Sequence, residues 1–176
     1  DGTYALRAIN DVCELGLSPQ ELAHDAGLLG SDCPFFVQDG AALVQGRGER
    51  VTPIDLSSAL DGCHVVVANP GIHIGTAEAF AHVKPQARVT DWQGLAGTPL
   101  NQWHLHLRID FEVGLREQHS AVDELLTWMA EAGADHVQMT GTGSTVFGLF
   151  KDQASAKRAE TMCKEACQGL VWKGQC

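Results

Sequence analysis

The chain of 176 residues is 44% hydrophobic and 19% charged, the balance of a soluble globular protein rather than of a disordered one. Its 12 lysines and arginines against 22 aspartates and glutamates give a formal net charge of -10, which argues against nonspecific binding to nucleic acid. No run approaches the ~18 apolar residues of a membrane span and no secretory leader is visible, so we expect a cytoplasmic protein without a membrane partner.

The first sixty residues predict two helices. Apolar residues at helical spacing favour a helix over residues 1–15. A second helix over residues 18–29 has a strong start signal, because Ser18 suits the N-cap, Pro19 the first turn, and Glu21 completes a capping box.

Two strands follow, at residues 41–46 and 50–54, around a turn at 47–49. Residues 1–60 therefore contain two helices and a hairpin, but no larger sheet. Because a helix that begins at residue 1 needs something to pack on, we expect residues 1–60 to be the C-terminal part of an incomplete domain.

The remainder, residues 61–176, predicts a layered α+β domain. Residues 64–68 form a continuous apolar run typical of a buried central strand. Residues 83–98 read as a loop with one helical turn. Further helices are expected at residues 76–82, 111–118, 120–132 and 153–168, and further strands at 135–139, 145–150 and 170–173.

Asp32 is the first candidate for chemistry. It lies in the segment 30–36 (GSDCPFF), where a carboxylate follows a helix end and a proline two residues later stiffens the turn. An acid held on a rigid turn can accept or orient a substrate hydroxyl proton. The alternative is that Asp32 only caps the next helical turn.

The second candidate is the glycine-rich segment 139–145 (MTGTGST) between two predicted strands. Glycines let the backbone approach a ligand, successive N–H groups can surround phosphate oxygens, and the Thr and Ser hydroxyls add donors. The segment fits neither the Walker A pattern nor the dinucleotide fingerprint. A plain hairpin connection is the alternative.

The third candidate is the segment 69–78 (NPGIHIGTAE), where a strand end passes into a helix. Thr76 fits the helix N-cap, and either a polar substrate contact or simple capping explains it. His104 and His106 alternate with apolar residues, as on one strand face, but are read as surface residues rather than metal ligands. The six cysteines are read as reduced thiols, and no metal site is expected.

Taken together and in this order, the segments 30–36, 46–49 (GRGE), 69–79 and 139–147 resemble the 4-diphosphocytidyl-2-C-methyl-D-erythritol kinases, a branch of the GHMP kinases. The resemblance covers essentially the whole chain. Residues 110–112 (DFE) also look like the family's Asn-Asp-Phe-Glu element, although Ile109 stands where Asn is usual.

The resemblance implies the GHMP kinase fold, with a remnant of the N-terminal domain (1–60) followed by a two-layer α/β-sandwich C-terminal domain (61–176). It implies phosphorylation, by ATP with Mg2+, of the 2-hydroxyl of 4-(cytidine 5'-diphospho)-2-C-methyl-D-erythritol, in non-mevalonate isoprenoid synthesis. Asp32 would be the base or the hydroxyl-orienting group. Gly141, Thr142, Gly143 and Ser144 would line the active site and support the phosphate loop, and Thr76 would lie near the substrate.

Two parts that the family needs do not occur in these residues: a catalytic lysine and a phosphate loop ending in Gly-Gly-Gly-Ser-Ser. These parts would neutralise charge on the transferring phosphoryl group and hold the nucleotide with magnesium. We therefore expect the 176 residues to be inactive by themselves. Homoserine, mevalonate and galactose kinases fit residues 30–36 less well. A non-catalytic α+β ligand-binding module derived from a GHMP kinase is the alternative function.

Overall fold

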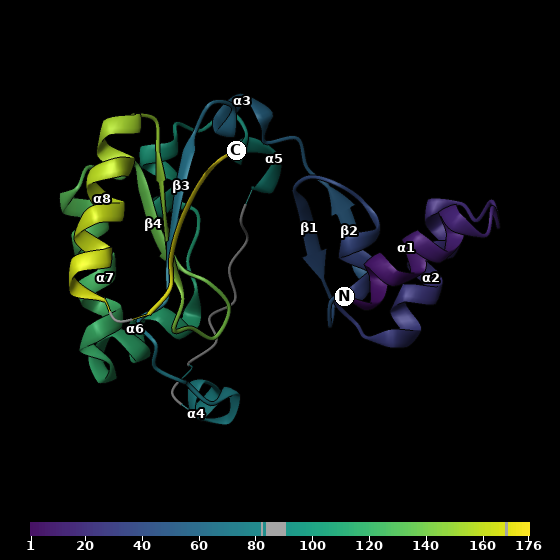
Figure 1. The fold of residues 1–176 in the computed structure, drawn as a ribbon, viewed down its shortest axis with the longest axis horizontal. Coiled ribbons are helices and arrows are strands. Elements are labelled where there is room, and N and C mark those ends of the chain that lie inside the picture. Colours follow the sequence, from purple (N-terminus) through teal and green to yellow (C-terminus); the bar gives the residue numbers. More distant parts are fainter. Residues whose placement is uncertain (82, 84–90, 168) are drawn as a thin grey trace. The chain divides into compact units, whose positions relative to one another are not determined.

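The computed structural model describes residues 1–81, 83, 91–167 and 169–176 (Figure 1). The chain forms two compact units, unit 1 (Asp1–Leu56) and unit 2 (Ser57–Cys176). The predicted boundary lies at residue 60, but the short helix α3 (Ser57–Leu60) belongs to unit 2. Two hydrogen bonds hold α3 there: Ser58 Oγ donates to the carbonyl of Ala96 at 3.0 Å, and Lys151 Nζ donates to the carbonyl of Ala59 at 2.8 Å.

Unit 1 consists of two helices, a 3-10 helix and a hairpin. These elements are α1 (Gly2–Val12), α2 (Pro19–Leu29), η1 (Cys33–Val37), β1 (Ala42–Gln45) and β2 (Arg50–Pro53). The predicted capping box of α2 is confirmed: Ser18 Oγ accepts from the Glu21 N–H at 3.3 Å, and Glu21 Oε2 accepts from the Ser18 N–H at 2.8 Å. Such a box satisfies donors that a helix start otherwise leaves unpaired.

Helix α1 buries a polar residue and exposes most of its apolar residues, unlike an ordinary amphipathic helix. Thr3 is its buried residue, and its hydroxyl donates to the carbonyl of Cys33 at 2.9 Å, which ties α1 to η1. The apolar stripe that predicted the helix is largely exposed, with Ile9 51% and Val12 82% accessible. The residues of unit 1 therefore provide little cover for this stripe.

Unit 2 contains a four-stranded antiparallel sheet in the order β4-β5-β3-β6. Its strands are β3 (His64–Ala68), β4 (His136–Met139), β5 (Val146–Phe150) and β6 (Val171–Gln175). The prediction that residues 64–68 form a central strand is confirmed, because β3 pairs with β5 on one side and with β6 on the other. Val66 and Ala68 point into the core and are fully buried.

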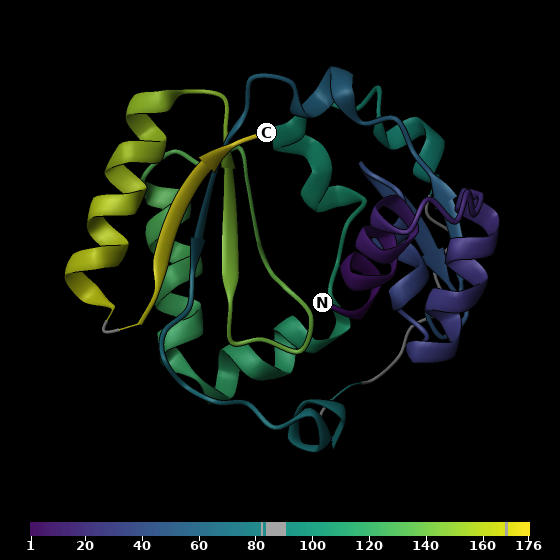
Figure 2. The same ribbon diagram turned by 45° about the vertical axis from the view of Figure 1, so that its right-hand side comes forward.

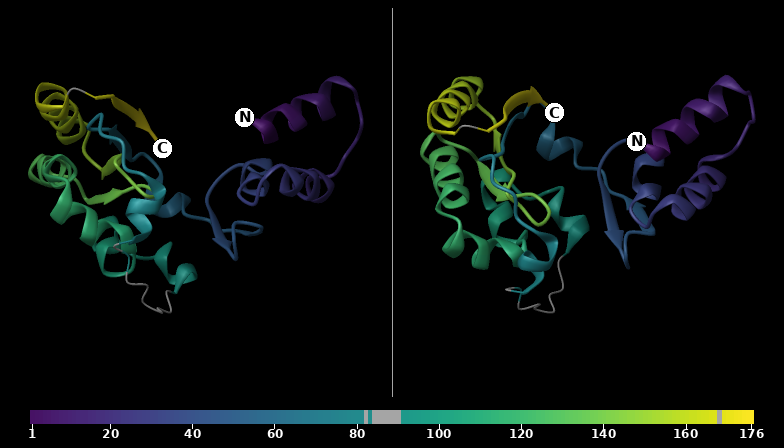
Figure 3. Two further views of the ribbon diagram at one scale, coloured as in Figure 1. Left: turned by 90° about the horizontal axis from the view of Figure 1, so that it is seen from below. Right: turned by 60° about the horizontal axis from the view of Figure 1, so that its bottom comes forward.

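Helices α7 (Ser120–Glu131) and α8 (Gln153–Ala166) lie side by side on one face of this sheet and complete a two-layer α/β sandwich (Figures 1 and 3). The core lies between the helices and the sheet, with Leu125, Met129 and Phe150 among its fully buried side chains. The other helices are α4 (Thr76–Ala81), α5 (Trp92–Leu95), η2 (Leu100–Leu105) and α6 (Asp110–Gln118). Residues 82, 84–90 and 168, which the predictions included, lie outside the described residues.

The strand that the alternation around His104 and His106 suggested is not formed. Residues 100–105 form the 3-10 helix η2, so the two histidines do not share a strand face, and both are exposed. Trp103 anchors η2 instead: its ring is buried and its Nε1 donates to the carbonyl of Thr98 at 3.1 Å. No helix in the described part of the chain is both long and apolar enough to cross a membrane.

Candidate active site

Asp32 lies in unit 1, at the turn between α2 and η1. It occupies the N-cap position of η1 but makes no side-chain capping hydrogen bond, so the capping explanation of this residue is not supported. Its side chain is exposed, while Pro34, two residues later, is buried and holds the turn in place. The structure therefore presents an accessible carboxylate on a rigid turn.

Gly48, in the β1–β2 turn, lies against Asp32. A Cβ atom at Gly48 would overlap Asp32 Oδ1 and the Ser31 carbonyl, and the φ angle of Gly48 is +124°, which L side chains rarely adopt. Only glycine fits this approach without moving the carboxylate. The predicted turn at residues 46–49 thus forms one wall of the Asp32 site within unit 1.

Glu49 closes the same turn. Its Oε2 accepts a hydrogen bond from the Arg47 N–H at 2.7 Å. Hydrogen bonds from the backbone N–H groups of Glu49 and Arg47 lower the pKa of the Glu49 carboxyl, because they favour its ionised form. The turn that carries Gly48 is therefore fixed by a charged side chain from its own segment.

The glycine-rich loop lies in unit 2, where it connects β4 to β5 as a hairpin. The Thr140 N–H donates to the Thr145 carbonyl at 2.9 Å, and the Gly143 N–H donates to the Thr140 carbonyl at 3.0 Å. Gly141 and Gly143 have φ angles of +58° and +82°. The hairpin alternative is thus right about the connection, and the glycines are required by the bend of its backbone.

Ser144 supports this loop from inside. It is 3% exposed, and its Oγ donates to the carbonyl of Ile72 at 2.6 Å. Asn69 Nδ2 donates to Thr145 Oγ1 at 2.8 Å, which makes a second tie between the two segments. The Ser144 hydroxyl proton is therefore committed to the protein, whereas Thr140 is exposed and Thr142 half-buried at the loop surface.

The segment 69–78 thus lies directly against the loop. Ile74 is buried, and a Cβ atom at Gly143 would come within 3.3 Å of its Cδ1 and within 2.8 Å of Met139 Sδ. Figure 2 shows the loop beside α6, in agreement with the approach of Gly143 to Leu115. The structure therefore brings together the predicted segments 69–78 and 139–145, which lie far apart in the sequence.

The sequence pattern predicts Thr76 as the N-cap of α4. In the structure, Thr76 is instead the first residue of the helix. The Gly75 carbonyl accepts the first helical hydrogen bond, from the Ala79 N–H at 2.9 Å, so Gly75 holds the capping position. Thr76 is exposed at the start of the helix. Glu78 Oε1, two residues later, lies 3.2 Å from His119 Nε2, a hydrogen bond that ties α4 to the junction of α6 and α7.

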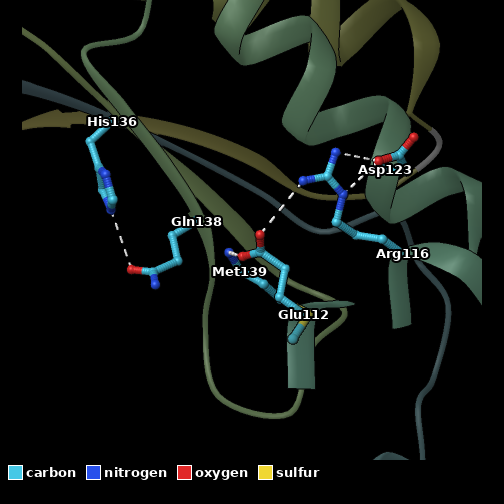
Figure 4. A network of polar contacts seen from close by, with 6 residues as sticks. All are labelled: Glu112, Arg116, Asp123, His136, Gln138 and Met139. Carbon is cyan, nitrogen blue, oxygen red and sulfur yellow. Dashed lines mark hydrogen bonds and ion pairs between the residues drawn. The ribbon is translucent and has the colours of Figure 1, made fainter. Parts of the chain in front are cut away.

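Glu112 joins α6 to the start of the glycine-rich loop (Figure 4). Its Oε2 accepts a hydrogen bond from the Met139 N–H at 3.0 Å, and its Oε1 lies 3.7 Å from Arg116 Nη1. Arg116 in turn contacts Asp123 at 2.6 Å. The Glu112 carboxylate thus accepts the N–H at the end of the edge strand β4 and fixes the point at which the loop begins.

Ile109 directly precedes the segment 110–112. It is the N-cap of α6, makes no side-chain capping bond, and packs against the core of unit 2. Apolar contact with the core thus stands in place of a side-chain cap at the start of α6.

Phe80 was missed by the sequence analysis. Its ring on α4 is 62% exposed and meets the Phe111 ring edge to face at 5.0 Å. An exposed aromatic ring on the same helix as Thr76 offers a stacking surface for a planar ligand group. In the sequence, Phe80 lies among alternating alanines of a short helix, and this pattern does not distinguish an exposed ring from a buried one.

His136 is the buried titratable group of the polar cluster in Figure 4. It is 4% exposed, and its Nε2 lies 3.3 Å from Gln138 Oε1. Burial lowers the pKa of the His136 imidazole, because removal from water penalises the charged form more than the contacts with Gln138 and Glu112 favour it.

A pH dependence of stability follows. Since the folded pKa of His136 is lowered, the unfolded chain takes up the proton first, and stability present above about pH 6.5 is lost as the pH falls below this value. We expect His136→Gln to lose less stability than the wild type between pH 7 and 5 in urea unfolding. The exposed His106→Gln should keep the wild-type slope, and an unchanged slope in His136→Gln would contradict the assignment.

The predicted site residues therefore fall into two groups. Asp32 lies beside Gly48 in unit 1. In unit 2, residues 141–144 lie against residues 72–74, which lead to Thr76 at the start of α4. Within the described residues, no three His, Cys, Asp or Glu side chains are grouped as metal ligands. Unit 1 offers a positioned carboxylate, and unit 2 offers a backbone loop rich in glycine and an exposed aromatic ring.

Comparison with known proteins gives consistent matches. Residues 94–169 match the family described as GHMP kinases C terminal. The chain is 31% identical over 175 residues to 4-diphosphocytidyl-2-C-methyl-D-erythritol kinase of Parabacteroides distasonis, covering 99% of this chain and 62% of that protein. It is 35% identical over 164 residues to the enzyme of the same name from Citrifermentans bemidjiense, covering 90% of this chain and 56% of that protein.

Solved structures agree with these matches. A crystal structure of 4-(cytidine 5'-diphospho)-2C-methyl-D-erythritol kinase superposes with a TM-score of 0.76 at 26% identity, covering 98% of this chain and 62% of that one. Homoserine kinase from Cytophaga hutchinsonii shares the fold, with a TM-score of 0.74 at 14% identity. The chain spans about 62% of the length of the first of these relatives.

Proposed function

The chain belongs to the GHMP kinases by its C-terminal domain, and on this premise we propose that it serves an ATP-dependent phosphorylation. The acceptor is the 2-hydroxyl of 4-(cytidine 5'-diphospho)-2-C-methyl-D-erythritol, an intermediate of non-mevalonate isoprenoid synthesis in the cytoplasm. The observation that carries the proposal is Asp32, an exposed carboxylate without a capping role in a chain similar to these kinases over 99% of its length.

In this function Asp32 accepts or orients the proton of the substrate hydroxyl. Phosphoryl transfer asks a protein mainly for positioning and charge stabilisation, and a carboxylate beside the attacking oxygen provides the first of these. Gly48 sets the position of Asp32, because its missing Cβ leaves room for the carboxylate. The remnant of the N-terminal domain would thus be residues 1–56, with unit 2 as the C-terminal domain.

The glycine-rich loop supports the phosphate side of the reaction. The N–H groups of Gly141 and Thr142 and the Thr142 hydroxyl are the donors that we assign to a phosphate, since the Gly143 N–H is used inside the loop. Ser144 acts through its bond to Ile72 and positions the loop. Magnesium bound with ATP would neutralise phosphate charge.

The substrate side is assigned to α4. Thr76 and Phe80 share this short helix, and the Phe80 ring has a face open to a planar group. A cytosine ring stacked on an aromatic side chain gains about 1–3 kcal/mol.

Phe80→Leu in the full-length protein should therefore raise KM for the cytidine substrate about tenfold and change kcat little, because stacking is similar in ground and transition states. Steady-state kinetics measure both constants. Trp172→Leu is the matched control, since Trp172 is also an exposed aromatic ring, on β6. Equal KM values for Phe80→Leu and the wild type would contradict the assignment.

We expect the 176 residues alone to show no ATP-dependent turnover. Unit 1, which holds Asp32, contains no lysine, and the first lysine of the sequence is Lys84. Unit 1 therefore offers no lysine side chain to neutralise charge on the transferring phosphoryl group. A coupled assay for ADP release checks this expectation, and measurable turnover by the isolated 176 residues would overturn it.

The test of the proposed function is an acceptor comparison with the full-length protein. Incubation with ATP should release ADP with the cytidine substrate and not with homoserine or mevalonate. A non-catalytic binding module would instead bind the cytidine substrate in calorimetry and leave ATP uncleaved, which would refute the kinase assignment.

A further inference from the structure

Two cysteines and a lysine form a row across three strands of unit 2. The register pairs His64 with Gln175 on β6 and with Phe150 on β5. One residue before His64, the same register places Cys63 opposite Cys176 on one side and opposite Lys151 on the other. Side chains that are directly opposite in an antiparallel ladder point to the same face of the sheet.

The hydrogen bonds show that the ladder keeps this register up to the cysteines. The Cys176 N–H donates to the Cys63 carbonyl at 2.9 Å, just as the Asn69 N–H donates to the Leu170 carbonyl at 2.8 Å at the opposite end of the same strand pair. Hydrogen-bonded antiparallel pairs have Cα atoms about 5.5 Å apart. A disulfide spans Cα separations of about 4.4–6.8 Å, so the two backbones are already at a suitable distance.

Both thiols are free, and they differ in accessibility. Cys176 is exposed, whereas Cys63 is fully buried, with its Sγ 3.4 Å from the Ala59 carbonyl. Lys151 Nζ donates to the same carbonyl at 2.8 Å, which holds an ammonium group in the row. An oxidant from solution therefore reaches Cys176 first, while the Cys63 thiol is buried beside it.

We propose that Cys63 and Cys176 form an oxidation site, at which a hydroperoxide converts the two thiols into a disulfide that joins β6 to β3. In the first step the Cys176 thiolate attacks one oxygen of hydrogen peroxide, and the O–O bond breaks. Cys176 becomes a sulfenic acid, and the other oxygen leaves as hydroxide, which takes up a proton to become water. In the second step the Cys63 sulfur attacks the sulfenic sulfur and a second water leaves. Two thiols thus lose two electrons and two protons, and one hydrogen peroxide becomes two waters.

The groups near Cys176 affect the rate of this reaction through the pKa of its thiol. Burial and the neighbouring Cys63 raise the pKa of the Cys176 thiol, while the Lys151 ammonium acts in the opposite direction. The thiolate fraction at pH 7 is therefore small, and the rate should rise with pH. Cys163 provides a contrast, because burial raises its pKa to about 11 and it is fully buried in the core.

The test is peptide mapping of the full-length protein after treatment with hydrogen peroxide, or with diamide as a second thiol oxidant. Trypsin cuts after Lys164 and Lys173, so Cys163, Cys167 and Cys176 fall in three different peptides and each can be assigned. We expect the peptide that begins at Gly174 to be joined to the peptide that contains Cys63. The oxidised protein should unfold about 5 °C higher than the reduced protein, because the cross-link closes a long loop.

Variants distinguish this site from general oxidation. Cys176→Ser should lose both the joined peptide and the shift in unfolding temperature, whereas Cys13→Ser, which removes an exposed cysteine of unit 1, should keep both. The proposal would be overturned if Cys176 were joined to another cysteine or oxidised to sulfinic acid with Cys63 still reduced. Thiols that stay unmodified at saturating diamide would overturn it as well.

Discussion

Asp32→Asn in the full-length protein is expected to lower kcat by about 10²–10⁴-fold, the contribution of a general base or of a group that orients the nucleophile. Asparagine keeps the shape of the side chain but cannot take a proton. Because Asp32 is exposed and makes no capping bond, its replacement should change the free energy of unfolding by no more than about 0.5 kcal/mol. Steady-state kinetics and urea unfolding measure the two quantities.

Two further variants sharpen this result. Asp11→Asn replaces another exposed carboxylate of unit 1 and should leave kcat unchanged. Gly48→Ala keeps the carboxylate but displaces it, because the added Cβ overlaps Asp32 Oδ1, and should lower kcat while Asp32 itself is intact. An Asp32→Asn enzyme that retains a tenth or more of the wild-type kcat would exclude Asp32 as the catalytic carboxylate.

Gly143→Ala is expected to destabilise unit 2 by about 3 kcal/mol, the largest stability effect that we expect of a single change. About 1 kcal/mol or more arises from the φ angle of +82°, and about 1–3 kcal/mol from overpacking against Met139. Met139 is fully buried and cannot move aside into solvent. The loop should also lose its geometry, so kcat should fall even at temperatures at which the variant is folded.

Gly62→Ala is the matched control for this change. Gly62 also has a positive φ angle, +71°, but a Cβ atom there meets nothing within 4 Å. The control should therefore cost only the conformational part, about 1 kcal/mol. Equal losses of stability in the two variants, measured by urea unfolding, would show that the close approach of Gly143 to Met139 has no energetic role.

The predictable parts of this fold are those that local signals determine. The capping box of Ser18 and Glu21 appears as predicted, because it needs only residues three apart in the chain. The apolar run at residues 64–68 indicates a buried strand since both of its faces must be covered. Such signals require no knowledge of distant contacts.

Two of the errors are local, and one arises from a contact between residues far apart in the sequence. His104 and His106 alternate with apolar residues as in a strand, yet the burial of Trp103 and its bond to Thr98 favour a 3-10 helix. Thr76 has the chemistry of an N-cap, but the helix starts one residue earlier in its hydrogen bonding, at Gly75. The domain boundary shifts to Leu56 because Lys151, far along the chain, holds α3 in unit 2.

The candidate site shows the same division. The sequence pattern selects Asp32 and residues 141–144, but only the structure separates their roles: Ser144 is tied to Ile72, and Asp32 is not used as a cap. Phe80 and Glu112 gain their significance from contacts with Phe111 and with the Met139 N–H, which no spacing in the sequence reveals.

The most direct test of the account is the identity of the reaction product. Full-length protein, ATP and 4-(cytidine 5'-diphospho)-2-C-methyl-D-erythritol should give, in 31P NMR, ADP and a new phosphate monoester on the 2-oxygen in equal amounts. The same sample with Asp32→Asn should show neither signal over the same time. Unchanged ATP with the wild-type protein, or transfer to homoserine in place of the cytidine substrate, would contradict the account.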